Sequence, residues 1–192
     1  MNGRVDWRWK LREAIEQIRT RYEHIGRGTG APFLAVVYPP EAERAVLREW
    51  RTLVGSLEPE FDVRTVDVLE VTSGVVQQFG AEALVESMND PMPGSNPEAE
   101  LGTLWTRAVA ASVREAALKP GSGRPVTVLE RLAALYPASG PRAVMQALWE
   151  ANHATLSGLV VLLIPGVLTD ARVYHFVSDT GPEEFMYRGD IL

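Results

Sequence analysis

Apolar residues alternate along the chain between a helical spacing and short continuous runs. Recurrence three or four positions apart, with charged residues in between, predicts an amphipathic helix over 11–25, inside an N-terminal helical region placed at 1–30. The same spacing predicts helices over 42–57, 71–79 and 98–118, and another that opens at 139–141. In the segment 98–118 we expect the following residues to face one way: Leu101, Leu104, Trp105, Ala108 and Ser112.

Two apolar runs are too short for helices and predict strands covered on both faces, 32–38 and 159–164. The run 62–68 carries Arg64 and Asp67, so we expect it nearer the sheet edge. Residues 126–129 form a further strand candidate. The last segments, 172–177 and 185–192, could add to the sheet.

Strands that alternate with helices predict an α/β protein with a mostly parallel central sheet of about four or five strands. Helices on both faces would make it a Rossmann-like three-layer sandwich. Proline and glycine mark loops at 89–97 and 119–125. Neither side of the first loop holds enough strands for its own sheet, so we expect a single domain, 1–192.

Composition narrows the function classes. The chain is 46% hydrophobic and 23% charged, as is typical of globular proteins, and its net charge of −6 disfavours nucleic acid. It has no cysteine, which excludes disulfides and thiolate metal sites. The N-terminus lacks a secretory signal pattern, and the longest apolar run, 159–164, is too short to cross a bilayer. We therefore expect a soluble, cytoplasmic protein without a membrane anchor.

Recognisable catalytic chemistry is missing from the sequence. A nucleotide-binding α/β protein places a glycine-rich turn after its first buried strand, but here Tyr38 is followed by Pro39, Pro40 and Glu41. The glycines of 26–30 precede the strand instead. The three histidines have no second ligand at a metal-binding spacing. We expect no enzyme activity, no cofactor and no metal.

Interaction is the remaining class, and three places supply candidate contact residues. Trp7 and Trp9 stand outside a clear helical period, which favours a docking surface. The segment 165–170 follows the last buried strand, where open α/β sheets bind ligands, and we interpret it as a loop with polar tips. The candidates there and near the C-terminus are Thr169, Arg172, Tyr174, Tyr187 and Arg188.

Several of these segments together resemble the BrxB-like small proteins of BREX phage-defence systems. The resemblance rests on 33–43, on Leu135-Tyr136-Pro137 before a helix, and on 160–166 leading into Val173-Tyr174-His175-Phe176. It implies a non-enzymatic accessory subunit of a bacterial defence operon, whose partner is a large PglZ-like protein of the alkaline phosphatase superfamily. The ending, 185–192, is more polar than the aromatic terminal strand of that family, which leaves a sister family open.

Two other functions remain open at this point. One is a degenerate nucleotide- or phosphate-binding α/β enzyme that uses the segment 165–174. The other is a DNA-binding accessory protein, which would need a basic stripe on the first helix. The residues of that stripe are Arg8, Lys10, Arg12, Arg19 and Arg21.

Overall fold

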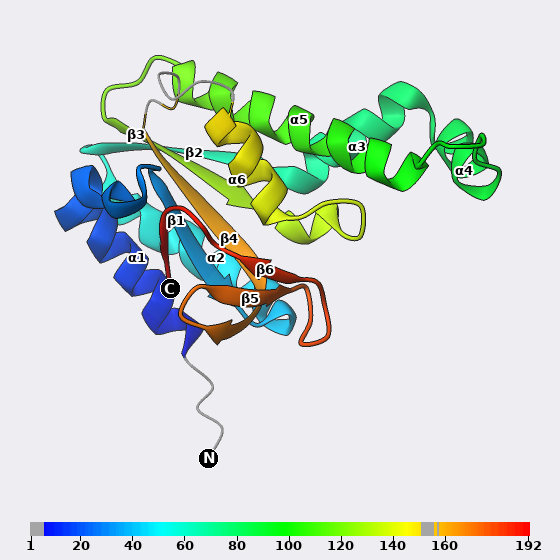
Figure 1. Cartoon of the computed structure of the whole chain (residues 1–192). Helices are drawn as coiled ribbons and strands as arrows, with labels where there is room; N and C mark the ends of the chain where they lie inside the picture. The colour runs from blue at the N-terminus through cyan, green and yellow to red at the C-terminus, as the bar shows by residue number, and fades with distance from the viewer. Residues whose placement is uncertain (1–5, 151–155, 157) are drawn as a thin grey trace.

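The structure, a computed structural model, describes residues 6–150, 156 and 158–192 (Figure 1). Its helices are α1 (Trp7–Arg21), α2 (Glu43–Val54), α3 (Val68–Phe79), α4 (Ala81–Asn89), α5 (Pro97–Leu118) and α6 (Pro141–Glu150). Its strands are β1 (Phe33–Tyr38), β2 (Phe61–Asp67), β3 (Arg124–Glu130), β4 (Leu159–Asp170), β5 (Val173–Phe176), β6 (Glu183–Phe185) and β7 (Asp190–Ile191). A short 3-10 helix, η5 (Leu132–Leu135), follows β3.

Five strands form a parallel sheet in the order β2-β3-β4-β1-β7. This confirms the predicted α/β class with a mostly parallel sheet. The two runs that are apolar throughout become β1 and β4, which lie side by side in the interior, and the more polar β2 lies at the edge as expected. Two further strands, β5 and β6, extend the far end of β4 in antiparallel fashion.

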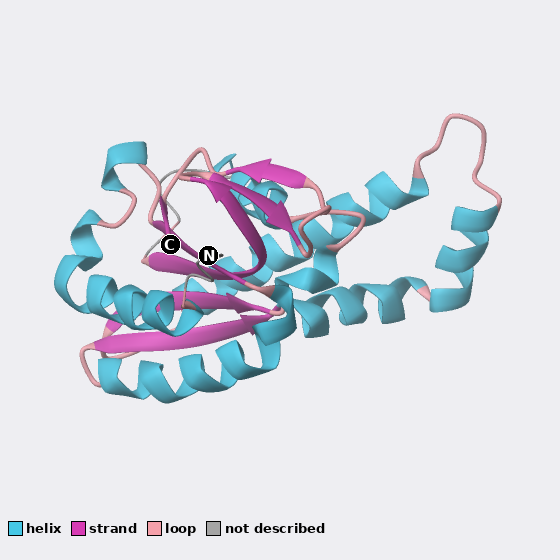
Figure 2. Ribbon diagram, turned by 90° about the horizontal axis from the view of Figure 1, so that it is seen from below, coloured by secondary structure: helices cyan, strands magenta, loops and turns pink. Residues whose placement is uncertain are grey.

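Alternate side chains of the central strands enter two separate cores. Leu34 and Val36 of β1 face α1 and α2, whereas Ala35 and Val37 face α3, α5 and α6. The two helical layers therefore cover opposite faces of the sheet, as Figures 1 and 2 show. Because every residue of β1 is buried, its unbroken apolar run follows from having helices on both faces.

One expectation about β4 is wrong: 165–170 is not a loop. The strand runs on to Asp170 and changes partner, because Pro165 is the last residue paired with β1 and Gly166 the first paired with β5. A Cβ at Gly166 would lie 2.4 Å from the carbonyl oxygen of His175, so glycine allows β5 to approach closely. Proline and glycine thus mark a change of ladder here, while the strand itself continues.

Helix α5 begins as predicted, with the Asn96 side chain accepting from the backbone N–H of Ala99 and Pro97 in the first turn. Of the face that the spacing predicts, Leu101 is buried, whereas Leu104 and Trp105 are half-buried. Two further residues of that face, Ala108 and Ser112, are also half-buried. The buried residues of α5 are Leu101, Gly102, Thr106, Val109, Ala110, Val113 and Ala116. The loop predicted at 119–125 is shorter, since β3 already starts at Arg124.

The end of α3, all of α4 and the start of α5 project sideways beyond the sheet (Figures 1 and 2). We call this projection, residues 75–104, the arm. Gly80, with φ of 85°, separates α3 from α4. The rest of the described chain, which contains the sheet, is the body.

Candidate functional site

The carboxyl ends of β2 and β3 lie at the edge where open parallel sheets usually bind ligands. Asp67 ends β2 and forms a two-point ion pair with Arg131, in which Nε and Oδ1 are 2.7 Å apart. Glu130 ends β3 and its Oε2 lies 2.6 Å from Nη2 of Arg51. The acids at this edge are therefore paired with neighbouring arginines.

The corner after β1 presents acceptors and few donors. Pro39 and Pro40 have no N–H, and the Tyr38 hydroxyl lies 3.2 Å from the Glu43 carboxylate. Burial and the nearby Glu43 raise the pKa of Tyr38 well above its usual range. The second oxygen of Glu130, Oε1, is buried without a hydrogen-bond partner among the described residues. A phosphate at this corner would meet carboxylates in place of backbone N–H groups.

Of the three candidate residues, Thr169 lies in β4, Arg172 in the turn that follows, and Tyr174 in β5. Thr169 is exposed, but Arg172 is used internally, because it donates to the carbonyl oxygens of Met186 and Gly189 at 2.8 and 2.9 Å. Tyr174 is completely buried, and its hydroxyl donates to Glu184 at 2.5 Å. The expectation of a contact through Tyr174 is therefore wrong, and a nucleotide enzyme would lose the loop on which that alternative depends.

The N-terminal candidates lie on α1, and of the two tryptophans Trp9 is the more exposed, at 52%. Trp7 packs against the core beneath α1 and carries the Arg8 guanidinium 4.3 Å above its ring. The basic stripe proposed for DNA is incomplete, because Lys10 is buried and donates from Nζ to the Val37 carbonyl at 2.9 Å. Burial also lowers the pKa of Lys10, which disfavours its charged form.

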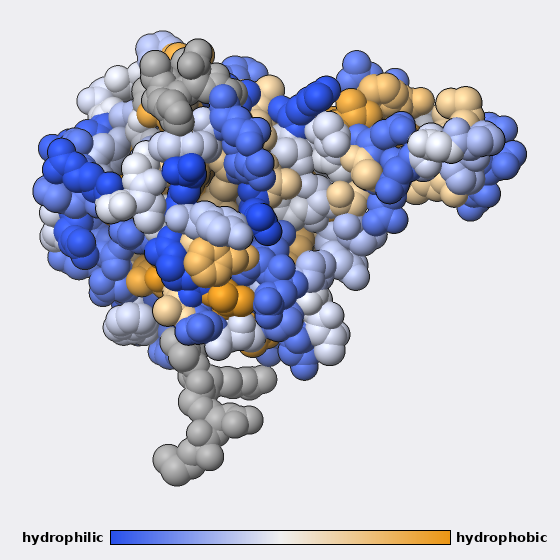
Figure 3. All heavy atoms as spheres, viewed as in Figure 1, coloured by the Kyte–Doolittle hydropathy of each residue, from blue (hydrophilic) through white to orange (hydrophobic). Residues whose placement is uncertain are grey.

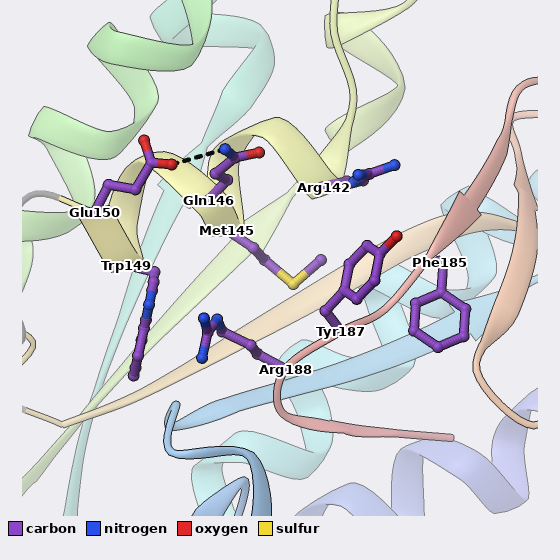
Figure 4. A pocket seen from close by; sticks show the side chains of 8 residues that line it. All are labelled: Arg142, Met145, Gln146, Trp149, Glu150, Phe185, Tyr187 and Arg188. Atoms are coloured by element: carbon purple, nitrogen blue, oxygen red, sulfur yellow. Dashed lines mark hydrogen bonds between the residues drawn. The ribbon is translucent and has the colours of Figure 1, made fainter.

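The structure brings two candidates, Tyr187 and Arg188, into one pocket between α6 and the segment after β6 (Figure 4). The pocket has a volume of about 300 Å³. The Arg188 guanidinium lies 4.0 Å from the ring of Trp149, and that of Arg142 lies 4.9 Å from the ring of Tyr187. The remaining lining residues are Met145, Gln146, Glu150 and Phe185.

A further exposed apolar surface lies on the arm. All nine residues of α4 are described, and none of them is buried. Val85 is 57% exposed, Met88 42%, Phe79 49% and Met92 77%. Figure 3 shows apolar atoms gathered over the arm among hydrophilic ones. Exposed apolar residues that cluster in this way are typical of interaction surfaces.

Beside α4 the arm is hollowed. A groove of about 330 Å³ lies between α4 and α5 and continues to the turn before α6. Val76, Leu84 and Trp105 line it, and the Trp105 indole nitrogen is buried with no hydrogen-bond partner in the described part of the chain. The groove therefore offers mainly apolar walls.

Charge separates the arm from the body. From residue 65 to residue 106 the chain has seven Asp or Glu and neither Lys nor Arg, although the whole chain has 19 Lys or Arg. Acids at Glu82, Glu86 and Asp90 therefore border the exposed apolar residues of α4 without cations in between. Sequence reasoning missed this surface, and the long interval without a cation is the signal that could have found it.

Comparison with models of known protein families, with curated proteins and with solved structures finds no match to this chain. Across 6–150, 156 and 158–192 no group of three or more His, Asp or Glu residues could hold a metal ion. A search of the described helices for one long and apolar enough to cross a membrane also finds none. The fold and the surface together define an α/β protein with a projecting acidic and apolar arm.

Proposed function

We propose that the protein is a non-enzymatic interaction subunit that uses its arm to hold a larger protein. Following the resemblance to BrxB-like proteins, we place it in the cytoplasm, in a bacterial phage-defence system of the BREX type. Its partner there is a large PglZ-like protein. The observation that carries the proposal is α4, a helix with exposed apolar side chains and no buried residue, in an interval with no Lys or Arg.

The chemistry of the arm defines the part of the partner that it would bind. Val85 and Met88 need an apolar face to cover them, and the groove beside α4 can receive side chains of a helix. Glu82, Glu86 and Asp90 would meet Lys or Arg residues that flank that face. The occupant that we propose is therefore a basic amphipathic helix of the partner protein.

Two features of the sheet edge support the non-enzymatic part of the proposal. The acids there pair with Arg51 and Arg131, and the corner after Tyr38 has two prolines where a phosphate-binding turn needs N–H groups. A surface that lacks activated groups but exposes apolar area is better suited to binding than to catalysis.

The test is co-purification of the chain with each product of its operon, followed by variants of the arm. Val85→Ser combined with Met88→Ser should weaken the complex about tenfold or more, because central apolar contacts dominate such interfaces. Leu118→Ser, at the other end of α5 and 75% exposed, is the matched control and should bind like the wild type.

Charge reversal tests the basic nature of the partner. Glu82→Lys with Glu86→Lys should slow association and weaken its dependence on salt, whereas Glu58→Lys with Glu60→Lys, away from the arm, should change little. If the wild-type chain purifies alone with every operon product, the interaction role is contradicted. If a complex forms but the arm variants bind normally, the arm is not the docking surface.

A further inference from the structure

We propose that the pocket between α6 and residues 185–188 binds a small organic anion, with a carboxylate or phosphate group on a flat apolar body. The residues that line the pocket (Figure 4) come from 142–150 and 185–188, which belong to the body and not to the arm. Its volume of about 300 Å³ lies at the lower end of the range for small-molecule sites. The proposal therefore does not depend on the docking function of α4.

The cationic part of the site consists of two arginines. Within the described residues neither Arg142 nor Arg188 forms an ion pair with a carboxylate, although the chain has more acids than bases. Arg51, Arg64 and Arg131 do form such pairs. Two unpaired guanidinium groups that line one pocket supply the charge that an anion needs.

Both guanidinium groups lie over aromatic rings. Arg188 lies over Trp149 at 4.0 Å, and Arg142 lies over Tyr187 at 4.9 Å. A guanidinium that stacks through its face keeps the N–H groups along its edge available for hydrogen bonds in its plane. Among the described residues, the hydrogen bond of the Arg188 side chain is a long one to the Thr29 carbonyl, at 3.4 Å. The remaining N–H groups can bind a planar carboxylate or a phosphate in bidentate fashion.

Two acids near the arginines have other partners. Glu150 accepts a hydrogen bond from Gln146 at 2.7 Å. Glu184 accepts from the Tyr174 hydroxyl and from the backbone N–H of Arg142, and burial raises its pKa. Arg142 interacts electrostatically with Glu184, yet the two side chains form no ion pair within 4.0 Å among the described contacts. An added anion would therefore find both cations accessible.

The apolar part of the site is aromatic. Phe185 and Tyr187 contact each other edge to face, with ring centroids 4.6 Å apart, and remain 39% and 62% exposed. Met145 contributes the buried wall of the pocket. A flat ring would cover these side chains while its anionic group reached the arginines, which is why we assign both properties to one ligand.

The test compares charged probes with neutral counterparts of the same shape. Benzoate is paired with benzamide, and adenosine monophosphate with adenosine, and inorganic phosphate supplies charge without an apolar body. Binding is followed by NMR through the indole N–H signal of Trp149, which Trp149→Phe identifies. At least one anionic probe should produce a saturable shift, and its neutral counterpart should bind about tenfold more weakly or worse. Inorganic phosphate alone should bind more weakly than the better organic anion.

Variants locate the bound probe. Arg188→Gln and Arg142→Gln should each weaken the anionic probe about tenfold, because a charge-assisted hydrogen bond is lost. Arg48→Gln, on α2 at the opposite face of the sheet, is the matched control and should bind as the wild type does. Far-ultraviolet circular dichroism checks that each variant is folded.

Three results would overturn the proposal. They are the absence of a saturable shift with every probe at millimolar concentration, equal binding of charged and neutral probes, and unchanged binding in both folded arginine variants. A carboxylate preference over phosphate, or the reverse, identifies the anion within the proposed class.

Discussion

The body and the arm treat apolar and charged residues in opposite ways. In the body, Leu162 and its neighbours on β4 are fully buried, and acids such as Glu130 are paired with arginine. In the arm, Val85 and Met88 face solvent, and Glu82 stands in an interval with no cation. The sheet of the body thus buries its apolar residues and pairs acids at its edge with arginines, whereas α4 of the arm leaves both kinds of residue exposed.

This difference separates residues that hold the fold from residues that are available for function. Removing apolar area from the body should cost stability, because the area is already buried. Removing it from the arm should cost little until a partner is present, because the side chains are still in water. Stability measurements on matched variants can test that division directly.

The largest effect is expected in the body. Leu162→Ala truncates a fully buried side chain of β4, the strand between β3 and β1, and should lower the free energy of unfolding by about 2–5 kcal/mol. Val85→Ala in the arm should change it by less than about 0.5 kcal/mol. Urea denaturation followed by tryptophan fluorescence measures both. Similar losses in the two variants would contradict the division between body and arm.

A smaller effect is expected where the arm joins the body. Gly102 of α5 packs so closely on the turn before α6 that an added Cβ would lie 2.0 Å from the Ala138 carbonyl oxygen. Gly102→Ala should therefore destabilise by about 1–3 kcal/mol. Gly74, inside α3, has open space around it, so Gly74→Ala should stabilise by about 0.5–1 kcal/mol. Thermal or urea unfolding that gives both variants the same sign would contradict this close approach.

The smallest effect is a change in pH dependence. Burial raises the pKa of Glu184 above its ordinary value of 4.5, so ionisation of this group opposes folding. Its contribution is most favourable below pH 4.5 and is lost as the pH rises through the raised pKa. Glu184→Gln keeps an acceptor for Tyr174 and should reduce the loss of stability between pH 4 and pH 7. The exposed Glu86→Gln of the arm is the control, and equal slopes in both variants would contradict the prediction.

The fold could largely be predicted because the strongest strands are the simplest patterns. The runs 32–38 and 159–164 are apolar throughout, which places them in the interior of a covered sheet, and β1 and β4 are found there. Pro165 and Gly166 misled the prediction, since local sequence does not show that a strand can exchange one partner for another. The fully buried residues of α5 did not follow from the spacing, because Gly102 and Ala110 are small residues that allow close packing and add little to an apolar stripe.

The candidate sites were harder to predict, because they depend on which residues the fold leaves uncovered. Tyr187 and Arg188 were candidates from sequence, but their neighbours in the pocket, Trp149 and Arg142, come from a helix about forty residues earlier in the chain. Tyr174 was a candidate of the same residue type as Tyr187, but Tyr174 is completely buried whereas Tyr187 is exposed. An apolar stripe at helical spacing predicts a face that the fold will cover. The spacing of apolar residues in α4 therefore does not show that this helix has no buried residue.

The short β7 has a consequence for self-assembly. It is two residues long, and it closes the outer side of β1 through the pairs Leu34 with Asp190 and Ala35 with Ile191. Backbone hydrogen bonds between Leu192 and β1 extend this closure to Val37. Without it, β1 would present a fully apolar open edge, a template on which a second molecule could add a strand and begin a fibril. Asp190, Ile191 and Leu192 therefore protect the edge of β1 against edge-to-edge association with a second molecule.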